Sequence, residues 1–237
     1  MSDARMVLVG ATGLVGRTLI ARSAADRPGF RLAALARRRI DLPRGARMEM
    51  FVSEPAFWAE TIAALKPEIV INALGTTWKK SGKSEEAFRA VDHDLVIAVG
   101  RAAKEAGTRH FIHISSAGAS RMSRHLYLRV KGETEEDLAR LRFNRLDILR
   151  PGLLRGRRLG DTRPAEALMQ AASPLSDIFL QGQYRRYRSI SADRLVDTIY
   201  GLARERAGGR FIHEHDALLR AARRHLGSGP INLTFEV

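Results

Sequence analysis

The chain lacks cysteine and long apolar runs, and each absence excludes a class of protein. Without cysteine it can form no disulfide bond, no thiolate metal site and no catalytic thiol. No segment reaches the roughly 20 consecutive apolar residues that a helix needs to cross a bilayer. The first residues, MSDARMVLVGATG, run directly into an apolar strand and a glycine turn, without the separate cleavage region of a signal peptide. We therefore expect a soluble, cytoplasmic protein with no membrane partner.

Acidic residues are too few to balance the basic ones, because 26 Asp and Glu face 40 Lys and Arg and leave a formal net charge of +14. Such a surface attracts anions, including nucleic acids, without regard to sequence. The basic residues are scattered among acids, in segments such as ARRRI, RGRRLG, QYRRYRS and RAARRHLG. They form no continuous stripe, so we expect a nucleotide phosphate as the bound anion and no specific nucleic acid as a partner.

Apolar residues recur with two alternating spacings, which predict strands and helices in turn. The predicted strands are 5–11, 30–37, 46–52, 67–75, 109–118 and 145–152. The predicted helices are 13–25, 57–65, 84–107, 125–141, 191–207 and 216–227, with Ser84 and either Ser191 or Asp193 as N-caps and Gly107 as a helix end. This alternation predicts an α/β fold, a doubly wound parallel sheet with helices on both faces, in a single domain spanning residues 1–237.

The alternation stops after the sixth predicted strand. Residues 153–188 are polar and rich in turn-forming residues, which predicts a small lobe where a substrate would bind. The last segment, 228–237, has the pattern of either a tail or an edge strand, and the sequence leaves both open.

Three glycines lie between the first strand and the first helix, in the segment GATGLVG. A turn at this place brings the backbone close to a pyrophosphate, and the helix N-terminus offers it free N–H groups and a positive dipole. Gly10 would make the turn, Gly13 the close approach and Gly16 the tight packing of helix on strand. With their neighbours Thr12, Leu14 and Val15, these glycines form the predicted dinucleotide-binding turn.

Two arginines follow the second strand, at the place that distinguishes the two nicotinamide dinucleotides. In such folds an acid here binds the ribose 2′-hydroxyl, whereas an arginine accommodates a 2′-phosphate. The segment LAALARRRI carries Arg37 and Arg38 and no acid. Because guanidinium groups bind phosphate through charge-assisted hydrogen bonds, NADP(H) is favoured over NAD(H). An arginine cluster on a solvated loop stays the alternative in so arginine-rich a chain.

Small and polar residues also follow the fourth and fifth strands. The segment INALGTT supplies Leu74, Gly75 and Thr76, and HISSAG supplies Ser115 and Ser116. Ligands of open parallel sheets bind at the carboxyl ends of the strands, so both segments are expected to lie along the cofactor.

Tyr127 and Lys131 lie four residues apart on the next predicted helix, in YLRVKGETE. Side chains at this spacing lie one above the other on a helix face. Taken alone, the pair is an ordinary helix contact. Its significance depends on the motifs that precede it.

In this order, the glycine turn, the strand-ending serines and Tyr-x-x-x-Lys resemble the atypical short-chain dehydrogenase/reductases, which have an NAD(P)-binding Rossmann fold. The segments LGTTWKKSGKSEEAFRAVDHD, ISSAGAS, LYLRVKGETEEDL and LRPGLLRGRRLGDTRPAE are most similar to the HIV Tat-interacting oxidoreductase-like proteins and to NAD-dependent epimerase/dehydratase-like proteins. The resemblance covers most of residues 6–205.

The resemblance implies roles for these residues. Tyr127 would exchange a proton with a substrate oxygen, while Lys131 would assist it and hold the nicotinamide ribose. Ser116 matches the position of the substrate-binding serine better, and Ser115 stays open. The resemblance also implies that Pro151 and Gly152 form a turn beside the nicotinamide and that the backbone of Leu154 contacts the cofactor. The superfamily's helix asparagine has no clear match, but Asp92 or Asp94 stands near its place.

Two further features concern metal binding and the loop after the fourth strand. His213 and His215 in FIHEH supply two imidazoles without a third ligand, so no metal site is expected. Trp78 lies on a polar loop after the fourth strand, where it is either a lid over the nicotinamide or a partly buried anchor of the loop.

The first hypothesis is an NADP(H)-dependent oxidoreductase that transfers hydride to or from a small carbonyl or alcohol substrate. Its alternative is an NADP(H)-binding regulatory or redox-sensing protein with little turnover, which would act on a protein partner. A nucleic-acid-binding protein is a third. Substrate identity, reaction direction and oligomeric state are left open.

Overall fold

Seven parallel strands form one sheet in a computed structural model that describes residues 4–26, 29–46, 48–156, 177 and 180–227. Their spatial order is β3-β2-β1-β4-β5-β6-β9. The strands are β1 (Ala4–Val9), β2 (Phe30–Ala36), β3 (Met48–Val52), β4 (Ile69–Asn72), β5 (His110–Ile114), β6 (Arg145–Leu149) and β9 (Gly209–His213). The order reverses between β1 and β4, which opens a crevice at their carboxyl ends. The predicted doubly wound parallel sheet is confirmed.

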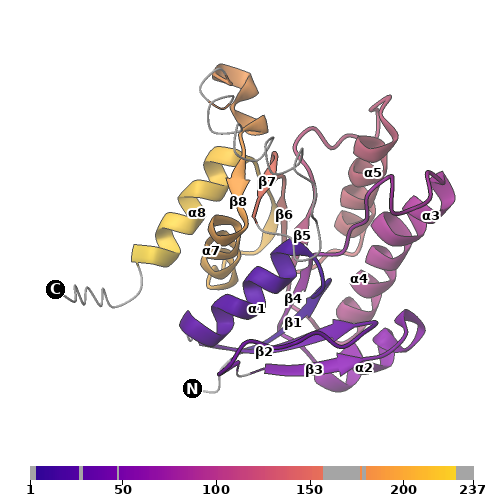
Figure 1. Cartoon of the computed structure of the whole chain (residues 1–237), viewed down its shortest axis with the longest axis vertical. Coiled ribbons are helices and arrows are strands. Elements are labelled where there is room, and N and C mark those ends of the chain that lie inside the picture. The colour runs from indigo at the N-terminus through magenta and orange to yellow at the C-terminus, as the bar shows by residue number, and fades with distance from the viewer. Residues whose placement is uncertain (1–3, 27–28, 47, 157–176, 178–179, 228–237) are drawn as a thin grey trace.

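Helices cover both faces of this sheet (Figure 1). One layer contains α1 (Leu14–Asp26), α7 (Ala192–Ala203) and α8 (His215–Gly227). The other contains α2 (Trp58–Leu65), α4 (Leu95–Glu105) and α5 (Leu126–Arg140). In the described ranges, no helix is both long and apolar enough to cross a membrane.

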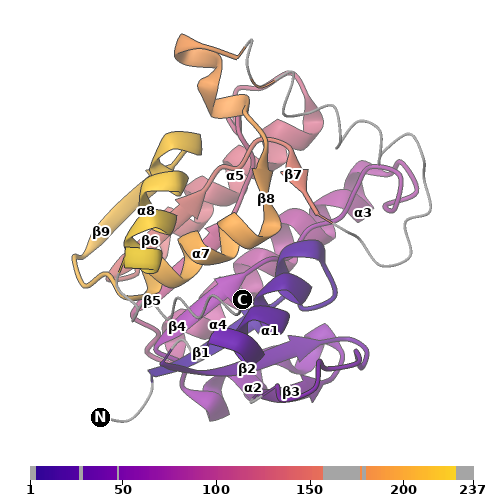
Figure 2. The ribbon, with the colours of Figure 1, turned by 60° about the vertical axis from the view of Figure 1, so that its left-hand side comes forward.

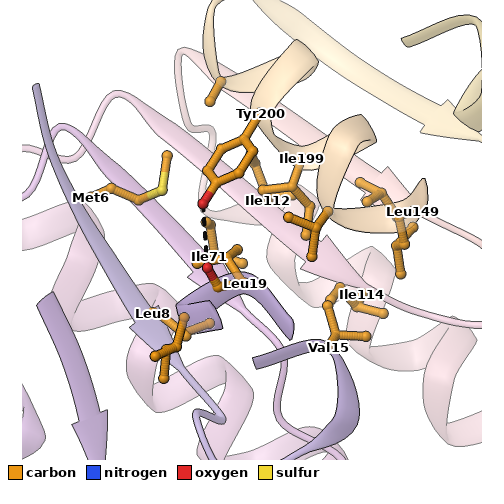
Figure 3. Packing of buried hydrophobic residues seen from close by; sticks show 14 of the residues in the cluster. Met6, Leu8, Val15, Leu19, Ile71, Ile112, Ile114, Leu149, Ile199 and Tyr200 are labelled. Atoms are coloured by element: carbon orange, nitrogen blue, oxygen red, sulfur yellow. Dashed lines mark hydrogen bonds between the residues drawn. The ribbon is translucent and has the colours of Figure 1, made fainter. Parts of the chain in front are cut away.

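Each layer buries its own hydrophobic core against the sheet, because successive side chains of a strand point to opposite faces. On the α1/α7 side, Leu8 and Ile112 of the strands pack with Leu19, Ile199 and other apolar side chains (Figure 3). In the same cluster the Tyr200 hydroxyl donates a hydrogen bond to the Leu19 carbonyl at 3.3 Å. Burying one large apolar side chain contributes about 1.5–3 kcal/mol, so these two cores hold the helices on the sheet.

A π-helical turn interrupts the predicted helix 84–107. The Ser84 hydroxyl caps its start by accepting a hydrogen bond from the Ala87 N–H at 3.1 Å, and α3 (Glu85–Arg89) follows. The π-turn, Ala90–Asp94, then leads into α4, and Gly107 follows the helix with φ +84°. The turn places Asp92 fully inside the protein, although the sequence predicts one continuous helix.

The structure adds a seventh strand that the sequence analysis did not predict. This strand, β9, lies at the edge of the sheet beside β6 and buries little of its surface. A second, two-stranded sheet pairs β7 (Leu154–Arg155) with β8 (Ile190–Ser191) beyond the N-terminal end of α1 (Figure 2). Most of the predicted lobe 153–188 and the whole segment 228–237 lie outside the described residues, so these two expectations stay predictions.

A buried carboxylate joins the last three strands. Asp147 on β6 is fully buried, and its two oxygens lie 2.5 Å from Nε2 of His110 and 2.6 Å from Nε2 of His213. The Arg145 side chain donates to both oxygens. Burial alone would raise the pKa of Asp147, but the hydrogen bonds from His110, His213 and Arg145 outweigh it and hold this pKa well below its usual range.

Asp147→Asn is expected to lower the free energy of unfolding by about 3–5 kcal/mol at neutral pH, because it leaves buried Arg145 without its counter-charge. A lowered carboxyl pKa stabilises the fold above the pKa of the unfolded chain, about 3.9, and this contribution is lost as the pH falls below that value. The difference between wild type and variant should therefore shrink below about pH 4. Urea unfolding across pH measures it. The exposed Asp41→Asn is the control, and an equal loss in both variants would contradict the assignment.

Candidate functional site

The glycine turn between β1 and α1 brings three backbone segments into close contact. Gly10 has φ +94°, which side chains rarely adopt, and a Cβ there would collide with the backbone of Ala73 after β4. A Cβ on Gly16 would collide with the Gly10 carbonyl and lie 2.8 Å from the Ala11 Cα. The Gly13 N–H donates to the Gly10 carbonyl at 3.1 Å and closes the turn. The turn therefore has no room for a side chain at Gly10 or at Gly16.

A cavity of about 600 Å³ opens in front of this turn. It lies at the carboxyl ends of β1, β2 and β4, where open parallel sheets bind ligands. Eight predicted cofactor residues line it, namely Gly10, Thr12, Gly13, Arg37, Arg38, Leu74, Gly75 and Thr76. Its volume is within the range of about 300–1,000 Å³ that is typical of ligand pockets. A larger cavity of about 840 Å³ lies at the opposite, amino ends of the strands, away from these residues.

Besides Ala11, Leu35, Ala36 and Ala73, which adjoin the predicted residues in the chain, five residues that the sequence did not assign to the cofactor line the cavity: Glu54, Trp58, Lys80, Val91 and Leu95. Glu54 follows the carboxyl end of β3, so the strand-end rule could have identified it. The other four come from α2, the loop after β4, the π-turn and α4, and no local pattern marks them. Leu14, Val15 and Gly16 were also predicted to bind the cofactor, but they do not line the cavity. Val15 belongs to the hydrophobic core.

Arg37 and Arg38 are both exposed at the edge of the cavity. Within the part of the chain that the structure describes, neither side chain forms an ion pair or a hydrogen bond. Glu54, also exposed, is the cavity's one carboxylate among the described lining residues. Both guanidinium groups are therefore available to an anionic ligand.

Lys131 does not line this cavity, but its ammonium lies next to Gly75, which does. Its Nζ lies 2.9 Å from Oδ1 of Asp92, and both side chains are almost completely shielded from water. The other oxygen, Oδ2, accepts a hydrogen bond from the Thr76 N–H at 2.7 Å. A Cβ on Gly75 would lie 3.5 Å from Oδ1 and 3.8 Å from Nζ. The ion pair therefore joins α5 to the segment after β4 that lines the cavity.

Asp92 and Asp94 are the two residues near the place of the superfamily's helix asparagine. Of the two, Asp92 is buried and Asp94 is exposed. The Asp94 side chain is 67% exposed and contacts the neighbouring His93, at 2.7 Å. The backbone carbonyl of Asp92 also accepts a hydrogen bond from the Thr134 hydroxyl of α5, at 3.0 Å. Side chain and backbone of the same residue therefore hold α5 in place.

His113 adds no second positive charge beside Lys131. Its ring is fully buried on β5, with Nδ1 3.0 Å from the Asn72 amide nitrogen. Burial lowers the pKa of His113 well below its usual value, and the Lys131 charge lowers it further. His113 is therefore neutral at neutral pH, and the adjacent buried cation is Lys131.

The two serines after β5 differ in their surroundings. The Ser115 hydroxyl is buried and donates to Oε1 of Glu135 at 2.5 Å, and Arg150 binds the same carboxylate through two nitrogens. The hydrogen bonds with Glu135 raise the pKa of Arg150, although burial opposes them. Ser116 is half-buried, and its hydroxyl makes one long contact, 3.4 Å, with the Ala117 carbonyl. Ser116 is therefore the serine with a hydroxyl available to a ligand.

Tyr127 is the second residue of α5, the helix that carries Lys131, and the residue is 42% exposed. The ring centroid lies 5.8 Å from that of Phe88 on α3. Further along α5, a Cβ on Gly132 would collide with the backbone of Ser120 and Arg121. This contact lets the loop that follows the serines pack directly on α5.

The predicted turn after β6 approaches a distant segment. A Cβ on Gly152 would collide with the carbonyls of Tyr187 and Arg188, and the Pro151 carbonyl accepts a hydrogen bond from the Ala117 N–H at 2.8 Å. Leu154 lies on β7, opposite Ile190. The turn therefore lies beside the segment that carries the serines, but it does not line the dinucleotide cavity.

The described residues contain no cluster of three or more His, Cys, Asp or Glu side chains placed to hold a metal ion. His213 contacts Asp147, and His215 is buried at the start of α8. The residues around the glycine turn, by contrast, fit a dinucleotide, because Gly10, Thr12 and Gly13 line the cavity and a Cβ on Gly13 would meet nothing closer than 3.4 Å, which leaves the backbone at the start of α1 open to a pyrophosphate.

The chain matches a family described as NAD(P)H-binding over residues 10–173. It is 37% identical over 171 residues to the protein of Emericella nidulans named "Protein fmp52, mitochondrial", which covers 70% of this chain and 72% of that protein. Among solved structures, a putative NAD-dependent epimerase/dehydratase from Bacillus halodurans superposes with a TM-score of 0.66 at 20% identity, covering 93% of this chain and 99% of that one. The Bordetella bronchiseptica enzyme WbmG in complex with NAD gives 0.65 at 15% identity, covering 97% and 80%.

The name of the Emericella relative contradicts our expectation of a cytoplasmic location, because it describes that protein as mitochondrial. The expectation was wrong for a physical reason. It was based on the missing cysteine and the missing secretory signal, and neither feature distinguishes the cytosol from another reducing compartment.

Asp92→Asn is expected to lower the free energy of unfolding by about 3–5 kcal/mol, because Lys131 is then buried without a counter-charge. Adding Lys131→Met to the same chain should restore much of that loss, since the buried charge is gone. Chemical denaturation of the four proteins of this double-mutant cycle measures the coupling. Asp94→Asn, in the same π-turn but exposed, should cost under about 1 kcal/mol. A loss in Asp92→Asn no greater than in this control would exclude the structural role of the pair.

Proposed function

This chain belongs to the NAD(P)H-binding family of proteins similar to the atypical short-chain dehydrogenase/reductases, and on that premise we propose that it is an NADP(H)-dependent oxidoreductase. Its substrate is a small carbonyl compound or the corresponding alcohol. The observation that carries the proposal is the position of Lys131, whose ammonium lies beside Gly75 at the end of the dinucleotide cavity. Tyr127 lies one helical turn before it.

In this proposal the dinucleotide lies across the carboxyl ends of the strands. The turn from Gly10 to Gly13 and the N-terminus of α1 hold its pyrophosphate. Arg37 and Arg38 bind the 2′-phosphate, and their exposure at the cavity edge supports the preference for NADP(H). Lys131, fixed by Asp92, binds the nicotinamide ribose. A bound nicotinamide would donate or accept the hydride.

The reacting oxygen of the substrate is bound by two hydroxyl groups. Tyr127 gives its proton to this oxygen during reduction and takes it back during oxidation. The Lys131 ammonium stabilises the negative charge that develops on the phenol oxygen as the proton leaves. Ser116 donates a hydrogen bond to the same substrate oxygen, and the occupied hydroxyl of Ser115 supports this choice between the two serines.

Tyr127→Phe is expected to lower kcat by about 10²–10⁴-fold, because it removes the proton donor and keeps the ring against Phe88. The dissociation constant for NADPH should change little. Absorbance assays of NADPH oxidation and fluorescence titrations measure the two quantities separately. Tyr184→Phe, at a tyrosine that is 55% exposed on the 3-10 helix Gly182–Tyr187, is the matched control. Equal turnover in both variants would remove the catalytic role of Tyr127.

The double variant Arg37→Ala/Arg38→Ala is expected to weaken NADPH binding by about 10–100-fold, because charge-assisted hydrogen bonds to the 2′-phosphate are lost. NADH lacks that phosphate, so its affinity should stay within about twofold. Calorimetric titration with both dinucleotides measures the ratio. Arg39→Ala changes the next exposed arginine, which does not line the cavity, and should leave both affinities unchanged. Equal losses for NADPH and NADH in the double variant would contradict a 2′-phosphate site.

The regulatory alternative has a distinct outcome. A protein that binds NADPH tightly and oxidises it with no member of a broad panel of aldehydes, ketones and quinones would be a sensor of the dinucleotide.

A further inference from the structure

A second, apolar cavity of about 260 Å³ lies against Tyr127. Its lining residues are Trp78, Phe88, His125, Leu126 and Tyr127. None of them lines the dinucleotide cavity. We call this cavity the aromatic slot, and we infer that it is the substrate subsite for a flat, aromatic aldehyde or ketone. This inference rests on the oxidoreductase function proposed above.

Three aromatic rings give the slot its shape. Phe88 is 1% exposed, and its centroid lies 5.8 Å from Tyr127 and 6.5 Å from Trp78, the latter in an edge-on arrangement. Trp78 and Tyr127, as whole residues, are 44% and 42% exposed. Phe88 is therefore the floor of the slot, and the two half-exposed rings are its walls. A flat ring between the walls would cover apolar surface and make the offset or edge-to-face contacts that aromatic groups prefer.

The chemistry of the lining selects against sugars. Among the described residues that line the slot, none carries a carboxylate, an amide or a guanidinium group. The lining offers a sugar three polar groups, the Trp78 indole N–H, the His125 imidazole and the Tyr127 hydroxyl, and its remaining surface is apolar, which favours a flat apolar ring over a molecule covered with hydroxyls. The slot is also slightly smaller than the range of about 300–1,000 Å³ that is common for pockets of drug-sized ligands. It fits a single substituted ring better than a nucleotide sugar.

The slot adjoins the proposed reacting groups through two segments of the chain. Trp78 follows Thr76, which lines the dinucleotide cavity and is bound to Asp92. Tyr127 precedes Lys131 by one turn of α5, and Figure 1 shows α3 and α5 side by side at this end of the protein. A ring in the slot therefore brings its carbonyl group next to the Tyr127 phenol.

Reduction in this arrangement balances without a further reagent. Bound NADPH would supply a hydride to the carbonyl carbon, and Tyr127 would give its proton to the carbonyl oxygen. The C=O π bond breaks, one C–H and one O–H bond form, and NADP⁺ and an aromatic alcohol leave. Solvent then returns a proton to the Tyr127 oxygen.

The chain has two tryptophans, and each lies at one of the two cavities. Trp58 is buried in the lining of the dinucleotide cavity, and Trp78 is a wall of the slot. In Trp78→Phe, quenching by NADPH therefore reports dinucleotide binding alone. In wild type, para-nitrobenzyl alcohol should add a saturable quenching that the Trp78→Phe protein does not show. Linear, unsaturable quenching of wild type by this alcohol would overturn the slot as a binding site.

Steady-state kinetics test the substrate class. With NADPH, wild type should prefer para-nitrobenzaldehyde to glyceraldehyde, a small polar aldehyde. Trp78→Ala should raise KM for the aromatic aldehyde about tenfold, because one stacking wall is lost, and leave its kcat within about twofold. The kinetics with glyceraldehyde should not change. Leu226→Ala, which removes a half-exposed apolar side chain of α8 outside both cavities, should change the kinetics with neither aldehyde.

Different results would overturn the slot as a substrate subsite and the oxidoreductase function. A preference for glyceraldehyde or a nucleotide sugar, or an equal effect of Trp78→Ala on both aldehydes, would overturn the slot and leave the oxidoreductase function standing, provided that Tyr127→Phe still abolishes turnover. Absence of NADPH quenching in Trp78→Phe would overturn the oxidoreductase function itself. NADPH quenching without turnover of any aldehyde would overturn both the catalytic function and the slot as a substrate subsite.

Discussion

A lysine ammonium and an aspartate carboxylate, 2.9 Å apart and shielded from water, connect the segments that meet beside the dinucleotide cavity. The Asp92 carboxylate also binds the backbone of Thr76, so three elements share one charged contact: the π-turn, α5 and the segment after β4. Removing two charges from water is costly, and such a pair is maintained only with good geometry and further hydrogen bonds. Because an asparagine would leave Lys131 without a counter-charge, the carboxylate is what allows the proposed ribose-binding lysine to stay ordered in the interior.

The π-turn and the glycine turn solve two parts of the same geometric problem. At the glycine turn, the absence of side chains lets backbone approach backbone, since Cβ atoms at Gly10 and Gly16 would collide with neighbouring segments. At the π-turn, the wider helix brings a polar side chain and a backbone carbonyl toward α5. Single π-turns inside α-helices are frequently found at functional sites, and in this one Val91 lines the dinucleotide cavity, while Phe88, just before the turn, lines the aromatic slot. The glycine turn therefore depends on close packing of backbone against backbone, and the contact of the π-turn with α5 depends on a buried ion pair.

Features with a local cause could be predicted from the sequence, and features that depend on distant residues could not. The parallel sheet follows from alternating apolar spacings, and the turn at Gly10 and the cap at Ser84 follow from residue types at fixed positions. The π-turn was missed because apolar residues keep helical spacing across it, at Phe88, Val91 and Leu95. Strand β9 was missed because it is an exposed edge with little apolar signal. The contact of Asp92 with Lys131 joins residues from separate helices, so no short motif contains it.

Likeness of fold to epimerases and dehydratases constrains the two halves of the site unequally. The dinucleotide half is built from strand ends and the glycine turn, which the parallel sheet positions in any protein with this topology. The substrate half is built from the loop that carries Trp78 and from the start of α5, and loops on a rigid scaffold vary independently of the fold. At identities of 20% and below, the solved structures establish the scaffold alone. The chemistry of the proposed substrate must therefore be inferred from the side chains around Tyr127, namely Trp78, Phe88, His125 and Leu126 in the slot and the buried Lys131 one helical turn further along α5.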